Sequence, residues 1–368
     1  MILVNDPGDS RHVYWPLEHA AWNGWTITDL VFPTFLFLVG CSIVFSIDTR
    51  LARGVPRKQI ALQIVKRAAL LFAIKMFISA FPHFHMTRLR IFGVLTRIAI
   101  CYLIAALLYL WNQRMRFALG VTVVLLIGYW MLMRWVPVPG YGMPVRDVPL
   151  LDKDGNLAAY LDRGFNALCQ RFLHTGLLYQ KTRDPEGLLS TLPAVASTLL
   201  GILTAKWLRL PEQKRDLRVL FGAGLFFLIT AHLWNLYLPI NKNLWTSSYV
   251  LLAAGIDILL LLLFYWVFDL RGFQHRSRAL RVAAWPWLVF GSNAIFAFVL
   301  SNMIVKISSM FRLPNGAKTT SLYGWTYIHL FSHGNSTANT SLVFAVFYVA
   351  ICFVPTWLLW RRGWFLRV

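Results

Sequence analysis

The sequence predicts an all-α polytopic membrane protein, with about nine full transmembrane helices and a truncated one at the N-terminus. Of its 368 residues, 58% are hydrophobic and only 14% are charged, whereas a soluble domain carries about a quarter charged residues. The 16 Trp and 27 Phe add apolar surface. One core surrounded by water could not bury so much apolar surface, so lipid is the expected solvent.

Nine segments provide the roughly 20 mostly apolar residues that a spanning helix needs. They are residues 27–48, 60–80, 91–111, 117–136, 189–209, 219–238, 247–268, 284–308 and 341–361. The apolar stub at 1–5 resembles the last turn of a tenth helix that begins upstream. The sequence shows neither an internal repeat nor a low-complexity tract, so we expect residues 1–368 to form one domain.

Basic residues alternate between the connections and predict the orientation of the chain. Connections 49–59, 112–116, 206–218 and 269–283 and the tail 361–368 hold about 18 Lys and Arg in about 52 residues. The alternate connections, 6–26, 81–90, 137–188, 239–246 and 309–340, hold about 12 in about 123 residues. The positive-inside rule places the first set in the cytoplasm and the second on the outer face.

The net charge of +21 is therefore a feature of membrane loops and does not indicate a nucleic-acid site. Membrane lipid is the expected partner. The four cysteines, Cys41, Cys101, Cys169 and Cys352, form no C-x-x-C motif, and we interpret them as small buried residues. His83 and His85 lack a nearby Cys or carboxylate, so no metal is predicted.

The long outer connection, residues 137–188, is expected to form a cap. Its stretch from Leu157 to Tyr179 spaces apolar residues for one face of a helix.

Polar residues within the spans need an explanation because unpaired polar groups are costly at membrane depth. They are Asp29, Lys66, Arg67, Lys75, Arg97, His232, Asp257 and Lys306. Lys66 and Arg67 can extend toward the cytoplasmic headgroups, and Asp29 can cap its helix beside Thr26. Arg97, Lys75 and Asp257 either form structural ion pairs or line a path for a substrate or an ion.

Four polar clusters are candidate sites, and each has an alternative explanation. His19 follows Glu18 among interfacial tryptophans, so it is either a general base or a bystander in an aromatic belt. The turn at 239–248, with Asn241, Lys242, Asn243 and Trp245, either binds a sugar or anion or joins two helices. Glu186 either favours a helix dipole or holds a substrate amine. Asn293 either ties helices together or touches substrate.

No phosphate-binding loop, dinucleotide fingerprint, zinc-protease motif or nucleophile elbow is present in the sequence. Four runs nevertheless resemble the heparan-α-glucosaminide N-acetyltransferase family and its bacterial relatives. They are LEHAAWNGWTITDLVFPTFLFLVG at 17–40, DPEGLLSTLPAVASTLLG at 184–201, PINKNLWTSSYVLLAAG at 239–255 and GSNAIFAFVLS at 291–301. A weaker match is RIFGVLTRIAICY at 90–102.

This resemblance implies a transmembrane acyltransferase that moves an acetyl group from cytoplasmic acetyl-CoA to a sugar amine on the far side. It implies catalytic roles for His19 and Asn5. The candidates for acceptor binding are Asp29, Glu186, Asn241, Lys242, Asn243, Trp245 and Asn293, and those for the donor are Arg97, Lys66 and Arg67. A bacterial inner membrane, with His19 on the periplasmic side, is the expected location, and the animal relatives suggest a homodimer.

The chain also departs from the family pattern. The S-L-D-x-x-R-G-like helix that normally precedes the position of Asn5 is represented only by its last turn, and the spacing from Asn5 to His19 is longer. The acceptor, a cell-wall or surface amino sugar, stays open. So do the choice between N- and O-acetylation and the choice between direct transfer and an acetyl intermediate on His19. Two other hypotheses remain: a transporter of a polar solute that uses Arg97 and Asp257, and a non-catalytic partner in a polysaccharide complex.

Overall fold

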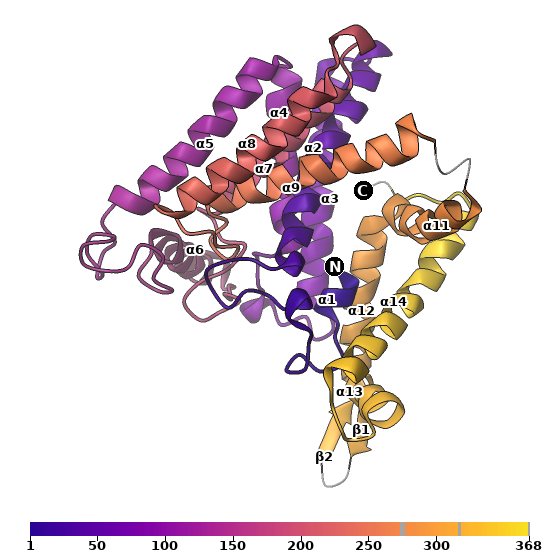
Figure 1. Ribbon diagram of the computed structural model, residues 1–368. Coiled ribbons are helices and arrows are strands. Elements are labelled where there is room, and N and C mark those ends of the chain that lie inside the picture. Colours follow the sequence, from indigo (N-terminus) through magenta and orange to yellow (C-terminus); the bar gives the residue numbers. More distant parts are fainter. Residues whose placement is uncertain (273–276, 316–317, 367–368) are drawn as a thin grey trace.

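The computed structural model describes residues 1–272, 277–315 and 318–366, and helices dominate it (Figure 1). The α-helices are α1 (Ile2–Asn5), α2 (Ile27–Ala52), α3 (Arg57–Ala80), α4 (Val94–Trp111), α5 (Met115–Trp135), α6 (Leu157–Leu173), α7 (Thr191–Leu208), α8 (Leu217–Asn235), α9 (Ser247–Phe264), α11 (Arg278–Ser292), α12 (Ala294–Met310), α13 (Leu322–Tyr327) and α14 (Ala338–Arg361). The 3₁₀ turns are η1 (Trp15–Leu17), η2 (Met86–Arg88) and η3 (Glu212–Lys214), and the π-helical turns are η4 (Tyr265–Leu270) and η5 (Ile328–Ser332).

The prediction of a helical membrane protein is confirmed, but the number of spans is not. Among the described residues, seven helices are long and apolar enough to cross a membrane, or eight if the bent pair α11 and α12 counts as one span. Two of the nine predicted segments are not continuous apolar spans in the structure. Segment 60–80 does form α3, but Lys66, Arg67 and Lys75 make it too charged to count as an apolar span.

The second difference is segment 284–308, which is not one continuous helix. It divides into α11 and α12, which bend by 79° at Asn293. The side chain of Asn293 bonds the backbone of the C-terminal tail: its Nδ2 donates to the carbonyl of Trp364 at 3.2 Å, and its Oδ1 accepts the N–H of Leu366 at 2.9 Å. The amide therefore holds the bend against the tail.

The core lies where α2 crosses α7. A side-chain carbon on Gly40 would overlap the carbonyl of Thr198, and one on Gly201 would overlap the carbonyl of Phe37. The two backbones therefore touch through their glycines, as membrane helices do at small-residue crossings. Helices α4 and α9 pack against this pair.

Outside this core, α5 packs along α7, and α8 packs along α9. Most of the surface of α5 and α8 stays exposed and apolar, as expected for helices whose outer neighbours are lipid. In Figure 1 the turns after α2 and after α4 lie at the top, whereas α6 lies at the left, below the lower end of α5. The two basic connections 49–59 and 112–116 thus share one end of the molecule.

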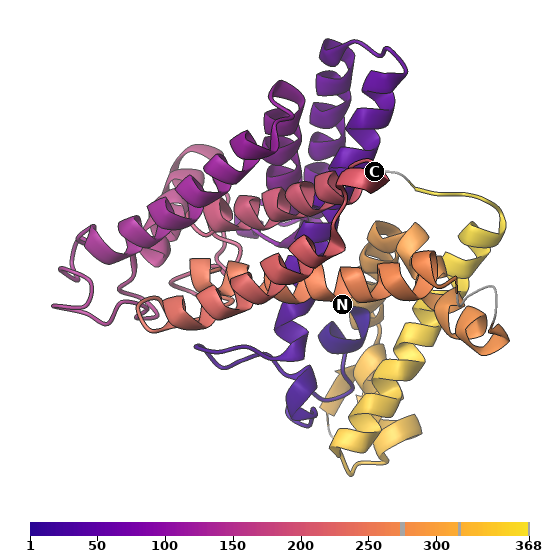
Figure 2. The ribbon, with the colours of Figure 1, turned by 45° about the horizontal axis from the view of Figure 1, so that its top comes forward.

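The C-terminal segment packs with the N-terminal turn. Helix α14 contacts α1, α11 and α12, and Figures 1 and 2 both show α1 (indigo) beside this orange-to-yellow segment. Connection 309–340 contains a β-hairpin that the all-helical prediction did not include. Strands β1 (Arg312–Asn315) and β2 (Lys318–Ser321) are antiparallel, with Arg312 opposite Ser321.

The amphipathic helix predicted between Leu157 and Tyr179 is confirmed as α6, although it ends at Leu173. Its first turn is capped by the Asn156 side chain, which accepts the N–H of Ala159 at 2.9 Å. Its buried face carries Asp162 toward the loop that precedes α7.

Candidate active site

An imidazole contacts a buried carboxylate at the start of α2. Nδ1 of His19 lies 2.7 Å from Oδ1 of Asp29. The aspartate side chain is 1% exposed and the histidine side chain is 51% exposed. Because an ionised carboxylate only accepts hydrogen bonds, Nδ1 carries the proton in this pair, and Nε2 is the nitrogen that can accept another. An exposed base oriented by a buried carboxylate is suited to proton abstraction from a substrate.

The local sequence explains why the carboxylate is held there. Thr26 is the N-cap of α2, and Asp29 is the third residue of the helix, so the two form a capping box. Oδ2 of Asp29 accepts the backbone N–H groups of Thr26 at 3.1 Å and Ala20 at 3.0 Å. Asp29 therefore caps α2, as its position beside Thr26 predicted, and its Oδ1 remains available to His19.

Lys242 completes this cluster from the turn between α8 and α9. Its Nζ lies 3.1 Å from Oδ1 of Asp29 and 2.9 Å from Nδ1 of His19. Nζ of Lys242 and Nδ1 of His19 both carry protons, so neither accepts a hydrogen bond from the other. They lie close together because both donate to Oδ1 of Asp29. Burial lowers the pKa of Lys242, and the Asp29 carboxylate opposes that shift.

The rest of this turn is structural. Asn241 is fully buried; its Nδ2 donates to Oδ1 of Asn23 at 3.1 Å, and its Oδ1 accepts the N–H of Leu244 at 2.9 Å. Trp245 is 1% exposed, and its indole donates to Ser197 at 3.1 Å. These contacts fix the backbone on either side of Lys242. Asn243 is half-buried at the same turn.

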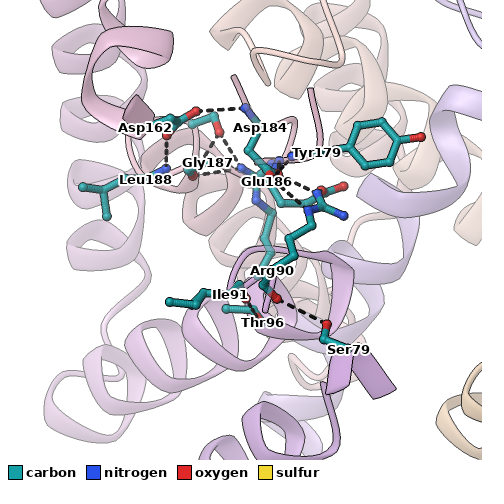
Figure 3. Close-up of polar contacts among 12 residues, drawn as sticks. Ser79, Arg90, Ile91, Thr96, Asp162, Tyr179, Asp184, Glu186, Gly187 and Leu188 are labelled. Carbon is teal, nitrogen blue, oxygen red and sulfur yellow. Dashed lines mark hydrogen bonds and ion pairs between the residues drawn. The ribbon is translucent and has the colours of Figure 1, made fainter. Parts of the chain in front are cut away.

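A second cluster joins the start of α4 to the loop before α7 (Figure 3). The Arg90 guanidinium makes two bonds to Asp184, at 2.8 and 2.6 Å, and one to Glu186 at 2.5 Å. Burial raises the pKa of Glu186, and the charge of Arg90 opposes that rise. Glu186 also contributes to the electrostatic field at Lys242, so the two clusters are electrostatically linked.

Asp162 anchors this loop from the cap helix. Its carboxylate accepts the backbone N–H of Leu188 at 2.8 Å and of Asp184 at 3.3 Å (Figure 3). Gly187 lies so close that a side-chain carbon there would overlap the Asp162 carboxylate. Burial raises the pKa of Asp162 to about 6, and the two N–H bonds oppose it.

Arg97 lies beneath the same loop and is 1% exposed. Its Nη2 donates to the carbonyl of Gly187 at 3.1 Å and to the hydroxyl of Ser190. Its guanidinium also lies 5.1 Å from the ring centre of Trp245. Arg97 therefore supports the loop before α7. Lys75 has a comparable role, because its Nζ donates to the carbonyl of Arg90 at 3.1 Å.

The remaining predicted site residues lie apart from His19. Asn5 is exposed at the end of α1 and, among the described residues, has no hydrogen bond to the His19–Asp29 pair. Lys66 is exposed on α3, and Arg67 lies over the ring of Tyr102 at 5.1 Å. The structure thus brings together His19, Asp29 and Lys242 of the predicted set.

Sequence reasoning did not select Arg90, Asp162 or Asp184. Two signals were available: Arg90 begins the RIFGVLTR run, and Asp184 begins the DPEG run. In the described part of the chain, no group of three or more His, Cys, Asp or Glu residues could hold a metal ion.

Comparison with known proteins gives one family. A family model described as heparan-alpha-glucosaminide N-acetyltransferase, catalytic, matches residues 10–232. The mouse protein named heparan-alpha-glucosaminide N-acetyltransferase is 30% identical over 343 residues, which is 81% of this chain and 50% of that protein. The human protein of the same name is 29% identical over 347 residues, with the same two coverages. The chain thus spans about half the length of the curated relatives it matches.

Proposed function

The chain belongs to the heparan-α-glucosaminide N-acetyltransferase family, and we propose that it transfers the acetyl group of acetyl-CoA to an amino sugar or glycan at the outer face of a membrane. The observation that carries this proposal is the His19–Asp29 pair, 2.7 Å apart and inside the matched region 10–232. The buried carboxylate fixes the protonated nitrogen, which leaves Nε2 as the base for the acceptor.

The proposed chemistry is one acyl transfer. The acceptor nitrogen attacks the thioester carbonyl, the new C–N bond forms, and the C–S bond breaks. His19 Nε2 takes the proton that the nitrogen loses and can return it to the departing thiolate. If the acceptor is a hydroxyl, the same base takes the hydroxyl proton and an ester forms.

We assign acceptor binding to Lys242 and Glu186. Lys242 is held beside the imidazole by Asp29, and it can donate to sugar hydroxyls. Glu186 is 14% exposed, is paired with Arg90 and lies within electrostatic reach of Lys242, which makes it suited to a sugar ammonium. Asn5 stays a predicted oxyanion donor.

The alternation of Lys and Arg supports the sidedness of the proposal. The basic connections would face the cytoplasm, where acetyl-CoA is made, and segment 6–26 would place His19 on the opposite face. We propose the inner membrane of a bacterium as the location. A homodimer, as the animal relatives suggest, stays a prediction.

The test is acetyl transfer by purified protein in detergent. Radiolabelled acetyl-CoA is supplied with a panel of amino sugars, and the labelled sugar is counted. We expect His19→Ala to lower transfer by about 10²–10⁴, the usual contribution of a general base, with an unchanged melting temperature. Near-wild-type transfer by this variant would remove His19 from the mechanism.

His12→Ala is the matched control. His12 lies on the same segment, and its Nδ1 is 3.1 Å from a carboxylate oxygen of Asp9, but that oxygen accepts the hydroxyl of Ser336 and is not part of the capping box of α2. We expect it to transfer at the wild-type rate. If folded wild-type protein releases no CoA with any acceptor, the chain is not an acetyltransferase, and solute flux in proteoliposomes becomes the next measurement.

A further inference from the structure

Asp257 is a buried carboxylate that the proposed acid–base pair does not use. It lies on α9 and is 5% exposed. Its Oδ1 accepts the hydroxyl of Thr34 at 2.5 Å, but its Oδ2 has no partner in the described chain. A buried polar atom without a hydrogen bond costs free energy inside a membrane span, so a ligand that supplies a donor there gains that bond.

Thr34 belongs to a stripe that follows one face of α2. The stripe recurs at the three- and four-residue spacing that places side chains on one helix face, and it consists of Thr34, Leu38, Ser42, Phe45 and Thr49. All but the half-buried Thr34 are exposed. The hydroxyls of Ser42 and Thr49 donate to carbonyls one turn back, at 2.9 and 2.7 Å, and keep their lone pairs available.

The stripe runs between the two regions that a bound coenzyme A molecule would contact, one for its thioester and one for its nucleotide. It begins about one and a half turns below Asp29, which holds His19, and it ends beside Arg50 in the basic connection 49–59. Lipid contact would account for Leu38 and Phe45. It would not account for an unpartnered carboxylate oxygen against Thr34.

The depth of Asp257 below His19 matches the distance from the sulfur to an amide nitrogen in the pantetheine arm of coenzyme A. Thr34 lies five residues after Asp29 along α2, which is about 7.5 Å at the rise of an α-helix. The pantetheine arm of coenzyme A contains two amides, and the nitrogen of the farther one is about 8 Å from the sulfur in an extended chain. With the thioester at His19, that N–H would reach the depth of Asp257.

We propose that Asp257 anchors the pantetheine arm of the acyl donor, with Oδ2 accepting an amide N–H and the α2 stripe forming the seat of the arm. This inference rests on the proposed function, because it takes acetyl-CoA as the donor. It adds a binding residue within the bilayer to the catalytic residues at the outer face.

The test is ligand binding to purified protein, measured by calorimetry without acceptor. The two probes are coenzyme A and adenosine 3′,5′-bisphosphate, which keeps the adenosine and its 3′- and 5′-phosphates but lacks the arm and the phosphate that joins it. We expect Asp257→Leu to raise the Kd of coenzyme A about tenfold, as loss of one hydrogen bond in a buried site does. The Kd of the bisphosphate should not change.

A second variant tests the stripe without disturbing a buried residue. Ser42→Trp adds bulk to the exposed face of α2 and should also weaken coenzyme A selectively. Its control is Val124→Trp on α5, where the side chain is 69% exposed, and that variant should bind both probes like wild type. Thermal melting of each variant confirms that it is folded.

Equal Kd values of coenzyme A for wild type, Asp257→Leu and Ser42→Trp would overturn the pantetheine site while leaving the acetyltransferase proposal intact. Weakening of both probes alike would also overturn it, because the effect would not depend on the arm. Wild-type protein that binds no coenzyme A would overturn the proposed function, and this inference with it.

Discussion

Asp29 uses its two carboxylate oxygens for different purposes. Oδ2 accepts backbone N–H groups at the start of α2, and Oδ1 accepts from His19 and Lys242. The bonds to Oδ2 stabilise the start of α2, and the bonds to Oδ1 position the side chains proposed for the reaction. A carboxylate that is held rigidly by a helix cap can hold the imidazole in one tautomer, which is what a general base requires.

We therefore expect Asp29→Asn to impair catalysis more than folding. An amide keeps one oxygen for the cap, but its NH₂ group would face Nδ1 of His19 and favour the tautomer that carries the proton on Nε2. Such a histidine cannot take a proton from the acceptor, so kcat should fall by about 10²–10⁴. The KM for acetyl-CoA should stay within about twofold.

Steady-state kinetics with acetyl-CoA and the best amino sugar measure both quantities. Asp9→Asn is the control, because Asp9 also contacts a histidine on the same segment but is not part of the site. A variant whose kcat stays at the wild-type value would show that Asp29 only caps the helix.

At the scale of elements, the crossing of α2 and α7 positions the site. Gly40 and Gly201 let the two backbones touch, and α2 begins at the capping box that holds His19. The start of α7 follows the loop that carries Asp184 and Glu186. The separation of the two clusters therefore depends on how closely these helices approach.

Gly201→Ala should destabilise the protein, because the added carbon would overlap the carbonyl of Phe37. Overpacking of this kind costs about 1–3 kcal/mol. Gly128→Ala on α5 is the matched control: a side-chain carbon there meets nothing within 4 Å, so this variant should be as stable as wild type or slightly more stable. Thermal unfolding in detergent compares them, and equal melting temperatures would contradict the close crossing.

Hydropathy predicted the existence of the helices better than their continuity. The long apolar runs at 27–48 and 341–361 became α2 and α14, because an apolar span has one stable conformation in lipid. The break at Asn293 was not predicted, since the residues on both sides are apolar and the cause is a distant one. The amide bonds the backbone near Trp364, about seventy residues away in the chain.

The candidate site shows the same limit of local reasoning. The sequence singled out His19, but its nearest carboxylate in the sequence, Glu18, is not its partner; Asp29 is. Lys242 was also selected, although its contact with Asp29 joins residues more than two hundred positions apart. Trp245 was expected at the substrate and lies in the core, because a turn rich in polar residues still needs an apolar anchor.

At the scale of the whole molecule, the proposal is that one chain joins a donor and an acceptor on opposite faces of a membrane. In this proposal the basic connections mark one face of the membrane and His19 the other. Donor and acceptor then cannot exchange through water, so the acetyl group must pass through the bundle. This sidedness distinguishes the proposed reaction from that of a soluble acetyltransferase.

The most direct test uses sealed inside-out vesicles that contain the protein and trapped glucosamine. Radiolabelled acetyl-CoA is added outside, at the cytoplasmic face, and His19→Ala vesicles serve as the background. We predict that label accumulates on the trapped sugar, and that glucosamine supplied only outside stays unlabelled until detergent opens the vesicles. Labelling of the external sugar in intact vesicles, with none on the trapped sugar, would contradict transfer across the membrane.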